Sequence, residues 1–130
     1  MADNKTYYYM RLKENFFDGN ELSVIEAMPD GFLYSNILLK MYLKSLRHEG
    51  RLMAGTIPYD AEMIAKITRH KVKTVKKALE LFDRAGLIEV LDNGAIYMLD
   101  IQNFVGKSTT EADRQRDYQR RIKEERENLR

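Results

Sequence analysis

The 130-residue sequence predicts a mainly α-helical fold with a small antiparallel β-sheet, arranged as a winged helix-turn-helix. Three neighbouring patterns between Tyr59 and Ile101 support this prediction. The first is a short amphipathic segment, the second is a longer basic helix, and the third is a pair of β-prone runs. Helix, turn, helix and hairpin in this order describe a winged helix, whose second helix commonly enters the DNA major groove.

The first helix of this unit is expected to begin at Asp60, whose side chain can accept hydrogen bonds from the amides of the first turn. Met63, Ile64 and Ile67 then supply an apolar stripe. The segment from Thr68 to His70 lacks apolar residues and predicts a break, where the Thr68 hydroxyl is expected to cap the next helix.

The second helix has two different faces. Three- and four-residue spacing predicts one buried face, made of Val72, Val75, Leu79 and Phe82. At 3.6 residues per turn, the opposite face carries His70, Lys73, Thr74, Lys77, Leu81 and Arg84. This outer face is therefore expected to be cationic, with a small hydroxyl at its centre. Gly86 is expected to end the helix in the left-handed conformation.

The hairpin is predicted at Asn93-Gly94, a strong turn signal between two β-prone runs. One face of the hairpin is expected to pack on the helices through Ile88, Val90, Tyr97, Leu99 and Ile101. The short β-prone stretch Arg51–Ile57 is expected to add a third strand.

The segments before this unit predict an arm and two helices. Thr6–Leu12 is expected to be a strand or an extended arm, in which three adjacent tyrosines serve packing or an interface rather than base stacking. Asn20–Ala27 predicts a short helix. Phe32–His48 predicts the longest helix, the spine of the core, with an apolar face formed by Phe32, Leu33, Ile37, Leu38, Met41, Tyr42 and Leu46.

Composition narrows the function classes. There are 22 basic and 20 acidic residues, so only local clustering of charge can argue for nucleic-acid binding. The chain has no cysteine and only two histidines, and it lacks the Gly-rich phosphate loops and the nucleophile elbow. The sequence therefore predicts no enzyme, no cofactor and no metal site. No apolar run reaches the roughly 20 residues of a membrane span, so a cytoplasmic protein is expected.

The character of the chain changes after residue 106. Residues 1–106 are expected to form the DNA-binding domain with its N-terminal arm, and residues 107–130 a charged helical tail or linker. Ser108 and Glu111 have the spacing of a capping box. Few apolar residues follow, so this helix is expected to be solvated, frayed or a linker. Its basic residues Arg114, Arg116, Arg120, Arg121 and Lys123 alternate with acids, which argues against DNA contact.

Nearly the whole chain, from about residue 6 to 121, resembles the N-terminal domain of phage replisome organiser proteins. The segments that carry the likeness are Tyr7–Asp18, Met28–Gly31, Leu43–Leu46, Ile57–Ala65, Ala78–Glu89 and Gly94–Gly106. The resemblance implies a protein of the bacterial host cytoplasm that binds double-stranded DNA at a phage origin and recruits the host helicase or helicase loader. It also implies a C-terminal domain, outside these 130 residues, that contacts the helicase.

The leading hypothesis is therefore a DNA-binding winged helix. Its candidate DNA-binding residues are Arg69, His70, Lys71, Lys73, Thr74, Lys76, Lys77 and Arg84. Those expected at base edges are Lys73, Thr74 and Lys77, and those expected at phosphates are Arg69, Lys71, Lys76 and Arg84.

The wing keeps two alternatives open. Its tip contains Asp92, with Glu89 and Asp100 nearby, where a wing that grips phosphates would carry Lys or Arg. The domain is therefore also compatible with an assembly module that forms oligomers or docks a replication protein. A winged-helix transcriptional repressor would share the same DNA chemistry. Both a monomer and a homodimer remain open, and so does the DNA target sequence.

Overall fold

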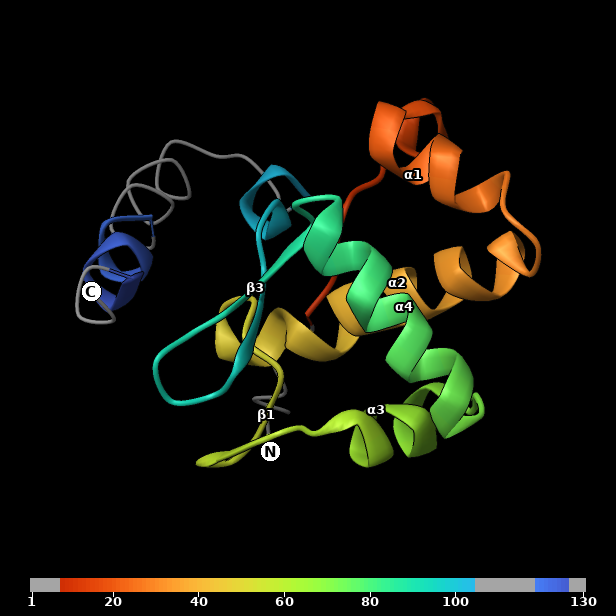
Figure 1. Ribbon diagram of the computed structural model, residues 1–130. Coiled ribbons are helices and arrows are strands. Elements are labelled where there is room, and N and C mark those ends of the chain that lie inside the picture. The colour runs from red at the N-terminus through yellow and green to blue at the C-terminus, as the bar shows by residue number, and fades with distance from the viewer. Residues whose placement is uncertain (1–7, 105–118, 127–130) are drawn as a thin grey trace, which may run out of the picture.

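The computed structural model describes residues 8–104 and 119–126, and helices dominate it (Figure 1). The helical elements are η1 (Phe16–Asp18), α1 (Asn20–Glu26), α2 (Gly31–Ser45), η2 (Leu46–His48), α3 (Ala61–Thr68), α4 (Val72–Arg84), η3 (Ile101–Phe104) and a helix over residues 119–126. The strands are β1 (Met53–Ala54), β2 (Ile57–Pro58), β3 (Ile88–Val90) and β4 (Ile96–Met98). The predicted class, mainly α with small antiparallel sheets in a winged-helix order, is confirmed.

Helix α2 is the spine of the core, as predicted, and packs against α1, α3, α4 and β4 (Figure 1). Ile37 and Met41 have no exposed surface. The assignment of Phe32 to the apolar face was wrong, because 70% of its surface is exposed. Phe32 shares the solvent side of α2 with Asn36 and Leu43, which are also exposed.

The two helices of the helix-turn-helix meet at a tight turn. Asp60 caps α3 as predicted, and its Oδ1 accepts from the Met63 amide at 2.8 Å. The expected cap at Thr68 was wrong: this buried residue ends α3, and its hydroxyl donates to the Ile64 carbonyl at 2.6 Å. The N-cap position of α4 is Lys71, whose side chain makes no capping hydrogen bond.

Gly86 ends α4 in the left-handed conformation, as predicted, with φ of 75°. The Leu87 amide donates to the Phe82 carbonyl at 2.9 Å, and the Gly86 amide to the Asp83 carbonyl at 3.2 Å. These two bonds form a Schellman motif, which satisfies the last carbonyls of the helix. The motif turns the chain directly into β3.

The hairpin lies where Asn93-Gly94 predicts it. The Gly94 amide donates to the Leu91 carbonyl at 2.9 Å, and the Leu91 amide donates to the Ala95 carbonyl at 2.8 Å. Gly94 has φ of 86°, and the Asn93 side chain accepts from the Ala95 amide at 2.9 Å. The connection is therefore a three-residue loop with a left-handed glycine, not a two-residue turn.

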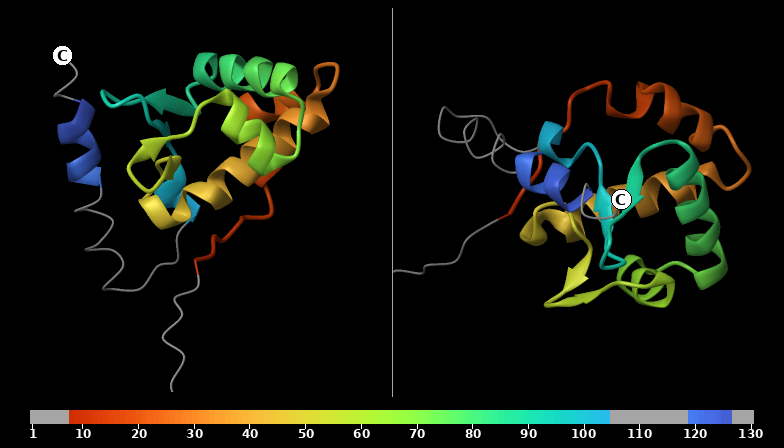
Figure 2. Two further views of the ribbon diagram at one scale, coloured as in Figure 1. Left: turned by 90° about the horizontal axis from the view of Figure 1, so that it is seen from below. Right: turned by 60° about the vertical axis from the view of Figure 1, so that its left-hand side comes forward.

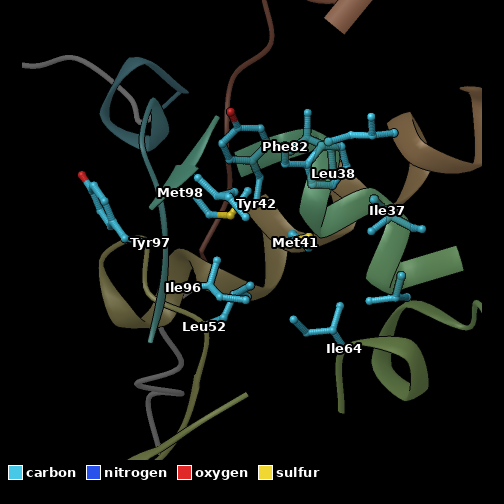
Figure 3. Packing of buried hydrophobic residues seen from close by; sticks show 14 of the residues in the cluster. Ile37, Leu38, Met41, Tyr42, Leu52, Ile64, Phe82, Ile96, Tyr97 and Met98 are labelled. Carbon is cyan, nitrogen blue, oxygen red and sulfur yellow. The ribbon is translucent and has the colours of Figure 1, made fainter. Parts of the chain in front are cut away.

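The expected hairpin face was right for Ile88 and Ile101, which are buried, but the strand pairing differs from the expected one by one residue. Ile88 pairs with Met98, and Glu89 pairs with Tyr97, so Tyr97 lies on the side opposite Ile88. Figure 3 shows Met98 and Ile96 within the core and Tyr97 pointing away from them. Val90, also expected to be packed, is 53% exposed. The three-residue loop shifts the pairing by one position, and such a shift exchanges the two faces of a strand.

The expected third strand is reduced to a single bridge. Arg51 pairs with Tyr97, and the Leu52 amide donates to the Ile96 carbonyl at 2.9 Å. The chain then turns back, since β1 pairs with β2 in a separate hairpin. The bridge places the fully buried Leu52 under the wing.

The N-terminal segment is an extended arm rather than a strand over its described residues. The Arg11 amide donates to the Phe104 carbonyl at 2.6 Å, which fixes the arm to the end of the domain. Tyr8 and Tyr9 are 47% and 58% exposed. Tyr7 lies outside the described residues.

The helix over residues 119–126 lies beside the β3–β4 hairpin (Figures 1 and 2). Ile122 is 2% exposed and joins the core. Around it, Arg121 pairs with Glu49, Glu125 with Arg51, and Arg126 Nε with Glu89 Oε2 at 2.9 Å; this last contact lacks the direction of a regular hydrogen bond. The expectation of a solvated or frayed helix was therefore wrong for this segment. The predicted capping box at Ser108 and Glu111, with Arg114 and Arg116, lies outside the described residues.

Candidate nucleic-acid interface

Helix α4 forms an outer edge of the molecule (Figure 2, left). Its buried residues are Val75, Ala78, Leu81 and Phe82, so the predicted packing of Val75 and Phe82 is confirmed. Leu79 is half-buried. The placement of Leu81 on the outer face was wrong: it is 8% exposed and lines a groove with Val24 and Ile25 of α1. This side of α4 therefore borders a groove shared with α1, and Leu81 does not belong to the solvent face.

The solvent face of α4 has two electrostatic halves. Lys73, Lys76 and Lys77 are exposed in the first two turns. The last turns carry Glu80 and Asp83, and Arg84 forms an ion pair with Glu80 at 3.2 Å. From Met63 to Leu79 the chain contains no acidic residue. The positive field is therefore concentrated at the N-terminal half of α4, and Lys73 there lies about 16 Å from Arg84 along the helix axis.

The turn before α4 adds to this half. Arg69 and Lys71 are exposed, and Arg69 has φ of 62°. We call the exposed set Arg69, Lys71, Lys73, Lys76 and Lys77 the α4 cation surface. A left-handed conformation costs an L-residue roughly 1–2 kcal/mol, and glycine avoids this cost. Arginine at this position therefore keeps a charge where the backbone favours glycine.

His70 connects the turn to α2 and adds no positive charge to the α4 cation surface. Its Nε2 donates to Asn36 Oδ1 at 2.8 Å. Burial lowers the pKa of His70 below its usual value, and the Lys40 ammonium lowers it further. The ring is therefore neutral near pH 7. Lys40 Nζ also donates to the Thr68 carbonyl at 2.8 Å, so two residues of α2 hold the turn in place.

Thr74 does not lie at the centre of the solvent face, where the sequence placed it. It is half-buried, beside the buried Val75 and Ala78. Asn36 and Lys40 were missed as supports of the turn. They lie more than 25 residues away from it in the sequence, so no local pattern identifies them.

The wing brings no positive charge to this surface. From Leu87 to Phe104 the sequence contains neither Lys nor Arg. Asp92 is exposed at the tip, and Glu89 is paired with Arg126. The α4 cation surface and the wing therefore differ in sign.

The part of the chain that the structure describes contains no group of three or more His, Asp or Glu side chains placed to hold a metal ion. None of its helices is long and apolar enough to cross a membrane.

Comparison with known proteins gives one match. A family model described as the N-terminal phage replisome organiser matches residues 9–127 of the chain. No curated protein and no solved structure matches it. The matched range includes the arm from Tyr9, the helix-turn-helix, the wing and the helix over residues 119–126.

Proposed function

Because the chain belongs to the N-terminal phage replisome organiser family, we propose that it binds double-stranded DNA of a phage origin through the α4 cation surface. The observation that supports this most is the position of the lysines. Lys71 and Lys73 lie at the N-terminus of α4, where no acidic residue occupies the first turn. Cations there oppose the helix dipole, at about 0.3–1 kcal/mol each. A DNA phosphate at the same place would interact favourably with both the lysines and the N-terminal end of the helix dipole.

The solvent face divides into positioning and reading residues. Arg69, Lys71 and Lys76 flank the face, so their charged groups contact backbone phosphates. Lys73 and Lys77 lie nearer its middle and contact base edges in the major groove. His70 supports the turn, Thr74 lies at the edge of the face, and Arg84 contributes less because Glu80 pairs with it.

The test is a fluorescence titration of Lys76→Ala and Lys77→Ala on origin and scrambled duplexes across salt concentrations. Lys76→Ala should weaken binding to both duplexes alike and reduce the salt slope by about 0.9. Lys77→Ala should cost about 1–3 kcal/mol on the origin and less on the scrambled duplex. The control is Lys123→Ala, an exposed lysine on the last helix. Equal losses on both duplexes for both α4 variants would exclude sequence reading, and no loss would exclude α4 as the contact.

We further propose that the protein helps to bring host helicase machinery to the origin, a role that rests on family membership. The test is size-exclusion chromatography of origin duplex, this chain and the host helicase or its loader. One complex with all three should elute if this chain suffices for recruitment. Separate elution of the helicase proteins would remove recruitment from this part of the protein.

An assembly module is the second candidate, and an apolar groove between α1 and α4 favours it. The groove contains Val24, which is 59% exposed, with Met28, Leu81 and Ala85. Light scattering of the protein without DNA separates the candidates. A monomer mass at the concentrations used for DNA titration would exclude self-assembly through this groove.

A further inference from the structure

We propose that a second site, between the N-terminal arm and the end of α2, binds an unpaired nucleotide of single-stranded DNA. A cavity of about 400 Å³ opens here, lined by residues of the arm, α2, η2 and β1 together with Tyr59. This volume falls within the range of small-ligand sites, roughly 300–1,000 Å³. The cavity shares no lining residue with the α4 cation surface.

Two tyrosines contribute to the lining of the cavity. Tyr8 and Tyr59 both line it, with Met53 beside them. The Arg47 guanidinium lies 5.0 Å from the centre of the Tyr8 ring, in a cation–π contact. Tyr8 is 47% exposed, so part of its surface stays open to a ligand. Bases of unpaired strands stack on such rings and on arginine planes.

The same cavity presents groups for a phosphate. Lys44, Arg47 and His48 line it, and no lining residue is acidic. The adjacent acid, Glu49, pairs with Arg121 through both carboxylate oxygens. Cationic donors beside aromatic faces match one nucleotide unit, its base against the rings and its phosphate against the cations. A peptide phosphorylated on serine or threonine would use the cations but leave the two tyrosines without a stacking partner.

Helix α2 connects this cavity with the duplex-binding surface. Asn36 of α2 holds His70 in the turn before α4. Arg47 follows Asn36 by about 16 Å, measured along the axis of α2 and its continuation η2. The proposed single-strand site and the proposed duplex surface therefore adjoin different parts of α2. The second site does not depend on duplex binding, and either one can fail without the other.

The test uses fluorescence anisotropy of a labelled oligothymidylate of about 12 nucleotides, a length within the site sizes of single-strand binding folds. Tyr8→Ala should weaken binding about tenfold, since one stacking partner is lost. Tyr8→Phe, which keeps the ring, should bind like the unmodified chain. Arg47→Lys, which keeps the positive charge but removes the planar guanidinium group, should lose part of the affinity for the oligonucleotide. Lys73→Ala should weaken duplex binding and leave oligothymidylate binding unchanged.

Three outcomes would overturn the proposal. The first is equal weakening by Tyr8→Ala, Tyr8→Phe and the control Lys123→Ala, which would indicate charge attraction without a site. The second is binding of thymidine monophosphate with the same dependence on Tyr8 but no binding of the oligonucleotide, which would assign the cavity to a free nucleotide. The third is a phosphotyrosine peptide that displaces the oligonucleotide at lower concentration than unlabelled oligothymidylate does.

Discussion

Helix α4 and the β3–β4 wing are neighbours in the sequence but use their charges in opposite ways. In the first two turns of α4, Lys73, Lys76 and Lys77 are exposed and have no carboxylate partner within the described residues. In the wing, Glu89 is half-buried and paired with Arg126 of the last helix. The wing packs its Ile88 and Met98 side on the core, while its Tyr97 side is shielded by Arg51 and the last helix.

This difference shows which half of the winged helix is available to a polyanion. Charges that already have partners inside the protein gain little from a phosphate, whereas cations without partners gain the full interaction. We therefore expect the wing to serve the protein's own stability, and under the proposed function α4 is the surface that binds DNA. The following changes test each half of this comparison.

Phe82→Ala should give the largest effect, because Phe82 has no exposed surface and fixes α4 to the core. We expect a loss of about 3–5 kcal/mol in the free energy of unfolding, measured by urea denaturation. Leu79→Ala should cost less, since Leu79 is only half-buried. Equal stability of the Phe82 variant and the unmodified chain would show that α4 is rotated relative to the face described above.

Ile122→Ala tests the wing half of the comparison. Ile122 is the buried apolar contact of the last helix, so its truncation should cost about 2 kcal/mol. The matched control is Lys123→Ala on the exposed side, which should change stability by less than about 0.5 kcal/mol. If both variants unfold at the same urea concentration as the unmodified chain, the last helix does not stabilise the wing.

Raising the pH should have an intermediate effect on stability, through Tyr97 of the wing. Burial raises the pKa of Tyr97 to about 12, against the lowering effect of Arg126 and Arg51. Because this pKa lies above the value of about 10 in an unfolded chain, the neutral phenol stabilises the fold below pH 10, and this stability is lost towards pH 12. Tyr97→Phe should therefore lose less stability than the unmodified chain over this window. Identical pH profiles in urea denaturation would place Tyr97 in solvent.

Asp92→Ala should give the smallest effect. Asp92 is exposed at the wing tip. Its carboxylate would repel any DNA phosphate that came close. Affinity for the origin duplex, measured by fluorescence titration, should therefore stay the same or rise slightly. A large loss of affinity would reveal a specific contact between the wing and DNA. It would contradict the assignment of DNA binding to α4 alone.

Local patterns predicted the helix-turn-helix well. Asp60, Gly86 and Asn93-Gly94 are signals whose physics lies within a few residues, namely a cap, a left-handed terminus and a turn. The buried side of α4 was predicted at Val75 and Phe82 because helical spacing reports one continuous face.

The errors arose where residues distant in the sequence determine whether a side chain is buried and on which face it lies. Leu81 is buried beside a groove that α1 and α4 share, and Tyr97 changed face because the hairpin loop has three residues instead of two. The last helix has too few apolar residues for a periodic signal, and ion pairs with Glu49, Arg51 and Glu89 help to hold it. Helical spacing predicted the exposure of Lys73 and Lys77, but their role in binding stays a prediction. The supports Asn36 and Lys40 were missed, since only the fold brings α2 to the turn.

Lysine acetylation with and without the origin duplex, read by mass spectrometry, tests the central claim without changing the protein. Bound DNA should protect Lys71, Lys73, Lys76 and Lys77, because we propose that their ammonium groups contact phosphates and base edges. Lys123, exposed on the other side of the wing, should react at the same rate in both samples. Protection of Lys123 with unchanged labelling of the four α4 lysines would contradict the assignment of DNA binding to α4.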